Sequence, residues 1–168
     1  AVRSRRSDQD VAAAAYDALI RGGSEYMALH PIVTVGPRSS IPHSTHRRVK
    51  IGRGAPVLIE VGACVHRYST ACMRAAMTRP VPAELRRLHE PCWESVDTVV
   101  QQMRPGVNGD TIARRADRVM SPWVRDYVWH GIYGYSLGLG FPPDWNDCPA
   151  VIQRGVDLVL RAGMVFHI

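Results

Sequence analysis

Glu60 is an acidic residue inside an otherwise apolar run, from Val57 to Val61. An ionised carboxylate that is buried in such a run without a partner costs free energy that is not recovered elsewhere. The sequence therefore predicts either a Glu60 that faces a polar cleft and does chemistry, or a Glu60 that pairs with Arg67 or Arg74. We favour the cleft, where a carboxylate can hold a cationic group through charge-assisted hydrogen bonds.

Two strands joined by a short turn are predicted to position this carboxylate, within residues 55–74. The first strand is the run that holds Glu60, Gly62 and Ala63 interrupt it, and a second run of strand-forming residues covers 65–73. Hydrophobic periodicity and capping residues predict the elements around this hairpin. They are helices at 8–21 and 24–30, a strand at 32–35, and helices at 81–103 and 110–120.

The composition is that of one globular domain, with 168 residues of which 46% are hydrophobic and 21% are charged. The net charge of +6 favours anionic partners, but the basic residues are scattered among acids and lack interleaved aromatic residues. Nucleic-acid binding is therefore not expected. The chain has no apolar run of membrane-spanning length and no signal-peptide pattern, which predicts a cytoplasmic protein without membrane contact.

The four cysteines show no C-x-x-C spacing, so neither a zinc site nor a redox pair is indicated. Cys64 and Cys72 fall within the proposed hairpin and are expected to be small buried hydrophobic residues rather than ligands.

Four motifs stand in a characteristic order along the chain. They are Val57-Leu58-Ile59-Glu60-Val61-Gly62-Ala63, Tyr68-Ser69-Thr70-Ala71-Cys72-Met73-Arg74, Gly134-Tyr135-Ser136-Leu137-Gly138-Leu139 and Gly163-Met164-Val165-Phe166. In this order they resemble the creatinase/aminopeptidase family, also called the pita-bread family. The resemblance covers nearly the whole chain and implies the α+β pita-bread fold, a curved antiparallel sheet backed by helices. It also implies that residues 1–168 are part of the C-terminal catalytic domain, without the small N-terminal domain and the last hairpin.

Metal-dependent members of this family bind two cations with two Asp, one His and two Glu. The resemblance places Glu60 and Ala71 at the two Asp positions and Tyr135 at the His position, with His130 as the alternative in another register. A methyl group cannot bind a cation, so the resemblance implies a protein without metal or other cofactor. The two Glu positions fall beyond Ile168, and the chain by itself is expected to be inactive.

Within the family, the resemblance is to the metal-free branch that contains ectoine hydrolase. Its most specific piece is the run Pro142-Pro143-Asp144-Trp145. The family also places a histidine about 17 residues ahead of the first carboxylate, and His43 lies at that distance from Glu60 whereas His46 does not.

These residues imply general-base hydrolysis of an amidine-type carbon. His43 would take a proton from water and return it to the departing nitrogen. Glu60 would hold the amidinium cation, and Tyr135, Trp145 and Tyr68 would bind the substrate. The plainer interpretations are that His43 stabilises a turn, and that the aromatic residues belong to the core or to a rim.

The leading hypothesis is a metal-independent hydrolase of a C–N bond in a small-molecule substrate, acting as a homodimer. A metal-dependent Xaa-Pro aminopeptidase or dipeptidase is the first alternative, which bound metal and sensitivity to a chelator would indicate. A non-catalytic binding module on the same fold is the second, which an absence of turnover would favour.

Overall fold

A computed structural model describes residues 2–145 and 150–168. The chain divides into two compact units, which are residues 1–82 with 138–146 and residues 83–137 with 147–168. None of the helices in the described ranges has the length and apolar character needed to cross a membrane.

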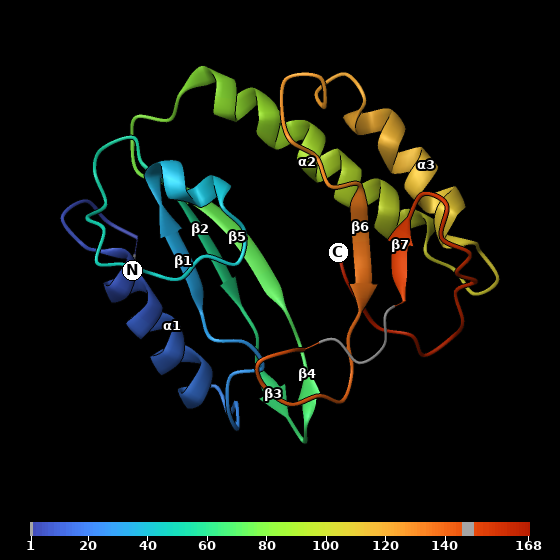
Figure 1. Cartoon of the computed structure of the whole chain (residues 1–168), viewed down its shortest axis with the longest axis horizontal. Helices are drawn as coiled ribbons and strands as arrows, with labels where there is room; N and C mark the ends of the chain where they lie inside the picture. Colours follow the sequence, from blue (N-terminus) through green and yellow to red (C-terminus); the bar gives the residue numbers. More distant parts are fainter. Residues whose placement is uncertain (1, 146–149) are drawn as a thin grey trace. The chain divides into compact units, whose positions relative to one another are not determined.

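The first unit contains a long helix and a three-stranded antiparallel sheet of order β1-β2-β5 (Figure 1). Its elements are α1 (Asp8–Arg21), β1 (Ile32–Val35), the 3-10 helix η1 (Gly36–Ser40), β2 (Pro56–Val61), β3 (Cys64–Val65), β4 (Tyr68–Ser69) and β5 (Cys72–Met77). The apolar side of α1 packs on the sheet through Val11 and Ala12, which lie in a core with strand residues. This burial fixes α1 to one face of the sheet.

Helix α1 begins where the sequence predicts, because Ser7 and Asp10 form a reciprocal capping box. The Ser7 hydroxyl accepts from the Asp10 amide, and the Asp10 carboxylate accepts from the Ser7 amide at 2.7 Å. Such a cap contributes about 1 kcal/mol to helix stability. The helix ends at Arg21, and Gly22 follows as its C-cap.

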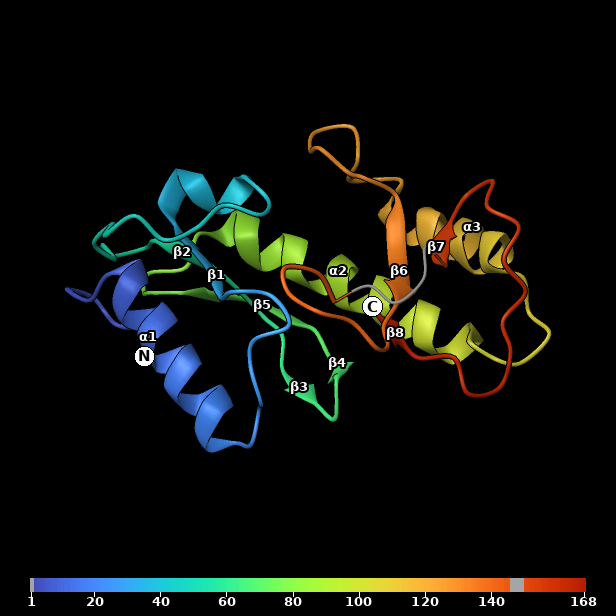
Figure 2. The same ribbon diagram turned by 60° about the horizontal axis from the view of Figure 1, so that its bottom comes forward.

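The predicted hairpin is confirmed, with one correction in its second half. Strand β2 pairs antiparallel with β5, with Glu60 opposite Met73. The second run is not one strand, because β4 turns back to pair with β3 before β5 begins. His66 and Arg67 form the turn between β3 and β4 with positive φ. Figure 2 shows this small hairpin beyond the end of the three-stranded sheet.

The helix expected at 24–30 is absent, since that segment runs as turns and bends with a bridge between Met27 and Ala63. The amide of Glu25 donates to the carbonyl of Cys64, and the amide of Ala28 donates to that of Gly62. These amides are thus used in pairing with the hairpin. Long-range pairing overrides the local preference for helix at this point.

The second unit packs two helices against a small antiparallel sheet of order β7-β6-β8. Its elements are α2 (Ala83–Gln102), α3 (Gly109–Met120), β6 (Ile132–Ser136), β7 (Val151–Gln153) and β8 (Phe166–His167). Both predicted helices and the predicted strand at 32–35 are confirmed. The core of this unit joins Val99 of α2 and Ile112 of α3 with Tyr133 of β6 and Ile152 of β7.

Candidate functional site

Strand β2 presents Glu60 on the face of the sheet away from α1. The strand residues that share a core with α1 are Val33, Val35, Val57 and Ile59. Successive side chains of a strand point to opposite faces, so Glu60 belongs to the other face. Its register partners there are Ile32 on β1 and Met73 on β5.

Glu60 is enclosed rather than open to solvent, because its exposed fraction is only 2%. The open polar cleft that the sequence suggests is therefore corrected to a buried position. The suggested ion pair is also corrected, since Arg67 pairs with Glu25 and Arg74 donates to the carbonyl of Met73. Across the described ranges, no hydrogen bond or ion pair reaches the Glu60 carboxylate.

Burial raises the pKa of the Glu60 carboxyl above its ordinary value of 4.5, and the nearby charge of His43 acts in the opposite direction. Desolvation is the larger cause because water is excluded from the ionised form. The influence of His43 on this pKa means that the imidazole lies within electrostatic range of the carboxylate. This electrostatic influence is the link between the two residues that the sequence proposes for catalysis.

Thr34 adds a second buried polar group on the same face of the sheet. It lies opposite Leu58, two residues along β1 from the partner of Glu60. Diagonal neighbours of this kind are roughly 7 Å apart and within reach of a shared ligand. The Thr34 hydroxyl is fully buried and has no hydrogen-bond partner in the described part of the chain. A buried hydroxyl without a partner costs free energy, and a bound ligand would remove that cost.

His43 is exposed and lies in the loop between η1 and β2, with a φ of 56°. A left-handed backbone at a residue other than glycine needs support from its surroundings. Arg38 gives that support to the residues that follow, because its guanidinium donates to the Ser44 hydroxyl at 2.7 Å and to the Thr45 carbonyl at 2.9 Å. Arg38 therefore holds the two residues that directly follow His43.

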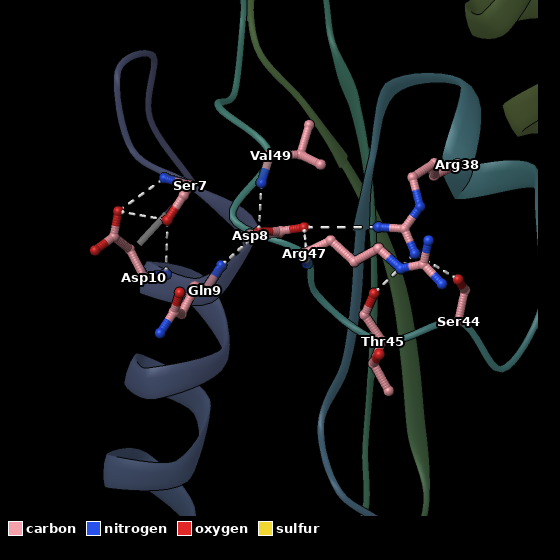
Figure 3. A network of polar contacts seen from close by, with 9 residues as sticks. All are labelled: Ser7, Asp8, Gln9, Asp10, Arg38, Ser44, Thr45, Arg47 and Val49. Atoms are coloured by element: carbon pink, nitrogen blue, oxygen red, sulfur yellow. Dashed lines mark hydrogen bonds and ion pairs between the residues drawn. The ribbon is translucent and has the colours of Figure 1, made fainter.

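Asp8 anchors this loop to the start of α1 (Figure 3). Its carboxylate is fully buried and accepts from the amides of Arg47 at 2.8 Å and Val49 at 2.9 Å, and from that of Gln9 at 2.8 Å. The Arg38 guanidinium lies 3.9 Å from the same carboxylate. Asp8 thus fixes both the end of the loop and the arginine that holds its middle. A carboxylate that accepts several hydrogen bonds of this kind is held firmly in one position.

Trp145 is also part of the first unit, and it packs on the end of the hairpin. A Cβ atom at Gly62 would lie 2.5 Å from Cε3 of Trp145 and 2.8 Å from the carbonyl oxygen of Thr70. Only glycine permits this approach. Gly62 directly follows β2 and lies two residues after Glu60. Trp145 is 4% exposed, whereas Tyr68 on β4 is 38% exposed. The Trp145 side chain is therefore buried against the hairpin, whereas the Tyr68 side chain is exposed to solvent.

Tyr135 belongs to the second unit, where it lies on β6 opposite His167 of β8. Its hydroxyl is 2.7 Å from Nδ1 of His167, and the two rings meet edge to face. Gly134 allows this pairing, because a Cβ atom there would lie 2.9 Å from the His167 carbonyl oxygen and 2.6 Å from Ile168. The sequence identified Tyr135 but not His167 as a candidate.

The donor atoms on the hairpin do not fit a two-cation site. Ala71 lies directly before β5 and offers no ligand atom. Within residues 2–145 and 150–168, no group of three or more His, Cys, Asp or Glu could hold a metal ion. Cys64 is a buried free thiol, as expected, whereas Cys72 is only half-buried. Cys148 lies outside the described residues.

Sequence reasoning missed Asp8 and Thr34 as candidates for this site. Asp8 looks like an ordinary acid in the first turn of a helix, which the helix dipole alone would explain. Thr34 carried a weak signal, since it is the one hydroxyl in the strand Ile32–Val35. Neither residue reveals its tertiary partners through local spacing.

Comparison with known proteins bears on the fold and the family. Residues 1–168 match the model of "Metallopeptidase family M24". An Xaa-Pro dipeptidase of Pyrococcus horikoshii is 26% identical over 163 residues, which cover 97% of this chain and 45% of that protein. An ectoine hydrolase of Halomonas elongata is 24% identical over 145 residues, which cover 86% of this chain and 36% of that protein.

Among solved structures, the prolidase from Pyrococcus furiosus has a TM-score of 0.87 and 25% identity, with 98% of this chain and 48% of that chain covered. This likeness confirms the α+β pita-bread fold that the sequence predicts. The chain spans less than half the length of the curated relatives it matches.

Proposed function

Because the chain belongs to metallopeptidase family M24, we propose that the whole protein is a hydrolase that has exchanged metal chemistry for the hydrolysis of a C–N bond in a small amidine-type substrate. The observation that carries the proposal is the buried Glu60 carboxylate. It has no partner in the described chain, and it lies within the electrostatic range of His43. A cationic substrate supplies the missing charge.

The donor set of the hairpin supports a mechanism without metal. The resemblance places Ala71 at the position of one metal-binding aspartate, and the described residues around Glu60 provide no cluster of further ligands. An amidinium carbon is electrophilic without a Lewis acid, because the attached cation withdraws electron density. The protein then needs an anion to hold the cation and a base to activate water.

Glu60 and His43 divide these two tasks. The ionised Glu60 carboxylate accepts hydrogen bonds from the amidinium N–H groups and orients the carbon. Neutral His43 removes a proton from the attacking water, whose oxygen forms the new bond to carbon. The imidazolium returns that proton to the departing nitrogen as the C–N bond breaks, and the hydroxyl proton left on the oxygen passes to the released amine, which gives a neutral amide and an ammonium group. Atoms and charge balance with water as the only co-reactant.

Burial of Glu60 sets a condition for this scheme. Since desolvation raises the pKa of Glu60, the free protein binds a proton there more readily than a solvated carboxyl does. A cationic substrate favours the ionised form, so substrate binding and proton release are linked. The acid side of the pH–rate profile is therefore expected above pH 4.5.

The aromatic candidates have separate roles in the proposal. Trp145 closes the site through its packing on Gly62, and Tyr68 borders it from β4. Tyr135 belongs to the second unit, where its hydroxyl lies 2.7 Å from Nδ1 of His167. The likeness to an ectoine hydrolase supports a cyclic amidine as the first substrate to examine. A homodimer in the cytoplasm, without nucleic-acid or membrane partners, completes the proposal.

The test uses the full-length protein and follows ectoine by NMR after exhaustive chelation. Turnover that survives chelation and is not increased by Mn, Co or Zn supports the proposal. His43→Asn is expected to lower kcat/KM by about a hundredfold or more, as expected for loss of a general base. His66→Asn is the matched control, because His66 is likewise exposed and has a positive φ of 52°. It should leave turnover unchanged.

A metal-dependent Xaa-Pro dipeptidase is the second candidate, favoured by the likeness to the Pyrococcus horikoshii dipeptidase. Hydrolysis of Xaa-Pro dipeptides that is lost on chelation and restored by a divalent cation would establish it and overturn the proposal. Failure to turn over amidines and Xaa-Pro peptides alike would favour a non-catalytic binding module.

A further inference from the structure

The first unit contains an open groove of about 860 Å³ whose walls are basic. Four cationic side chains line it, those of Arg5, Lys50, Arg53 and Arg79, and no acidic residue of the described ranges does. The groove contains neither His43 nor Glu60, and it plays no part in the proposed hydrolysis.

The charge of this part of the sequence is strongly asymmetric. Residues 1–82 hold twelve of the 21 Arg and Lys residues but only five of the 15 Asp and Glu residues. Four of those acids each pair with an arginine that does not line the groove, and the fifth is the buried Glu60. The pairs are Asp8 with Arg38, Asp10 with Arg6, Asp17 with Arg21 and Glu25 with Arg67.

As a result, the four groove cations form no ion pair with an acid among the described residues. Asp10 comes nearest to doing so, since Lys50 is one of the charges that lower its pKa. The largest cause of that lowering is the hydrogen bond from the Ser7 amide, however, and Arg6 also acts on the same carboxylate. The groove thus keeps an unbalanced positive charge, which attracts anions.

Three backbone hydrogen bonds and one from a side chain hold the three segments that form the walls. The Arg5 amide donates to the Ile51 carbonyl at 3.2 Å, and the Ile51 amide donates to the Arg6 carbonyl at 2.7 Å. The Gly54 amide donates to the Arg79 carbonyl at 3.3 Å, and the Thr78 hydroxyl donates to the Gly52 carbonyl at 2.6 Å. The charges are therefore carried on segments that are already fixed to one another, which lowers the entropic cost of binding.

We propose that this groove binds a small molecule that carries a diphosphate group. Its volume lies within the range of small-molecule sites, about 300–1,000 Å³. Guanidinium groups bind phosphate oxygens in pairs, and a diphosphate offers enough charge and enough oxygens to engage several of the four cations at once. The ligand is either free pyrophosphate or the diphosphate of a nucleotide, and two probes distinguish these sources.

The test is isothermal titration calorimetry of the full-length protein in metal-free buffer with about 150 mM KCl, where weak surface attraction is screened. The probes are inorganic pyrophosphate and ADP. We expect saturable binding of at least one probe with a Kd below about 1 mM. The double variant Arg53→Gln/Arg79→Gln should weaken it about tenfold or more, because charged hydrogen bonds are lost. Both side chains are exposed, and a melting curve confirms that the variant folds.

The matched control is Arg125→Gln/Arg161→Gln, which removes the same charge from exposed positions outside the groove. It should leave the Kd nearly unchanged. Equal weakening in both double variants would show attraction to net charge and would overturn the proposal. Absence of saturable binding, or a preference for single-stranded RNA that pyrophosphate fails to displace, would also overturn it. Because binding is measured without turnover, the result is independent of the proposed hydrolysis.

Discussion

The buried carboxylate of Asp8 is predicted to hold the loop that carries His43, and Asp8→Asn tests this directly. One oxygen of Asp8 accepts from the amides of Gln9 and Val49, and the other accepts from Arg47 and faces Arg38 (Figure 3). Asparagine keeps one oxygen and places an NH2 group at the other position. That group cannot accept from the Arg47 amide and also faces a cation.

The cost follows from these contacts. A hydrogen bond to a charged acceptor contributes about 1.5–3 kcal/mol, and an N–H left without a partner in a buried place costs about 1–3 kcal/mol. Partial hydration of the exposed Arg47 reduces the second contribution, so we expect a loss of about 3 kcal/mol in the local stability of the loop. The control is Asp17→Asn on the same helix. Its ion pair with Arg21 is exposed and is worth less than about 0.5 kcal/mol.

Hydrogen exchange measured by mass spectrometry on the full-length protein provides the assay, because it reports on residues 45–50 separately from the rest. A loss of about 3 kcal/mol should speed exchange there by about two orders of magnitude in Asp8→Asn. Exchange in the same peptides should be unchanged in Asp17→Asn. If Asp8→Asn shifted exchange of this segment by less than about fivefold, roughly 1 kcal/mol, Asp8 would not be the anchor of the loop.

Three further substitutions test the surroundings of Glu60. Glu60→Gln should stabilise the protein at pH 8 and have little effect at pH 4. Burial raises the pKa of Glu60 above 4.5, so the native state loses stability as pH rises through that raised pKa and glutamine removes the loss. Urea unfolding at the two pH values checks the sign, and equal effects would contradict it. Thr34→Val should change the unfolding free energy by no more than about 1 kcal/mol, because the hydroxyl has no described partner to lose. It should nevertheless raise the substrate KM; a large loss of stability would mean that the hydroxyl is already bonded. Gly62→Ala should destabilise the protein by about 1–3 kcal/mol through its clash with Trp145, with a change in tryptophan fluorescence. Gly52→Ala is the control, because no atom lies within 4 Å of the added methyl group; equal effects in the two variants would rule out the clash as the cause.

The hairpin and the position of Glu60 on it could be predicted from the sequence because their signals are local. A strand-forming run, a glycine interruption and a second run are visible without knowledge of distant residues. The burial of Glu60 could not be predicted in this way. It depends on what covers the face of the sheet away from α1, and neither the run Val57–Val61 nor its flanks contain that information.

The parts of the site that were missed depend on partners far along the chain. Asp8 accepts from amides that are 39 and 41 residues away. The segment 24–30 gives its amides to carbonyls at residues 62 and 64 instead of forming the expected helix. In both places, hydrogen bonds to a distant segment determine the local conformation. These partners cannot be predicted from the spacing of neighbouring residues.

Under our proposal, the methyl side chain of Ala71 and the burial of Glu60 have a common explanation. A carboxylate that faces a metal cation stays ionised, whereas the same group without a cation is driven toward its neutral form by desolvation. Burial raises the pKa of Glu60, and the charge of His43 acts against that rise. An organic cation with N–H groups would restore the charge balance there, and Thr34 on the same face offers a hydroxyl that can accept from it. Under our proposal, the ligand is therefore a cation that pairs with the Glu60 carboxylate and donates an N–H hydrogen bond to the Thr34 hydroxyl.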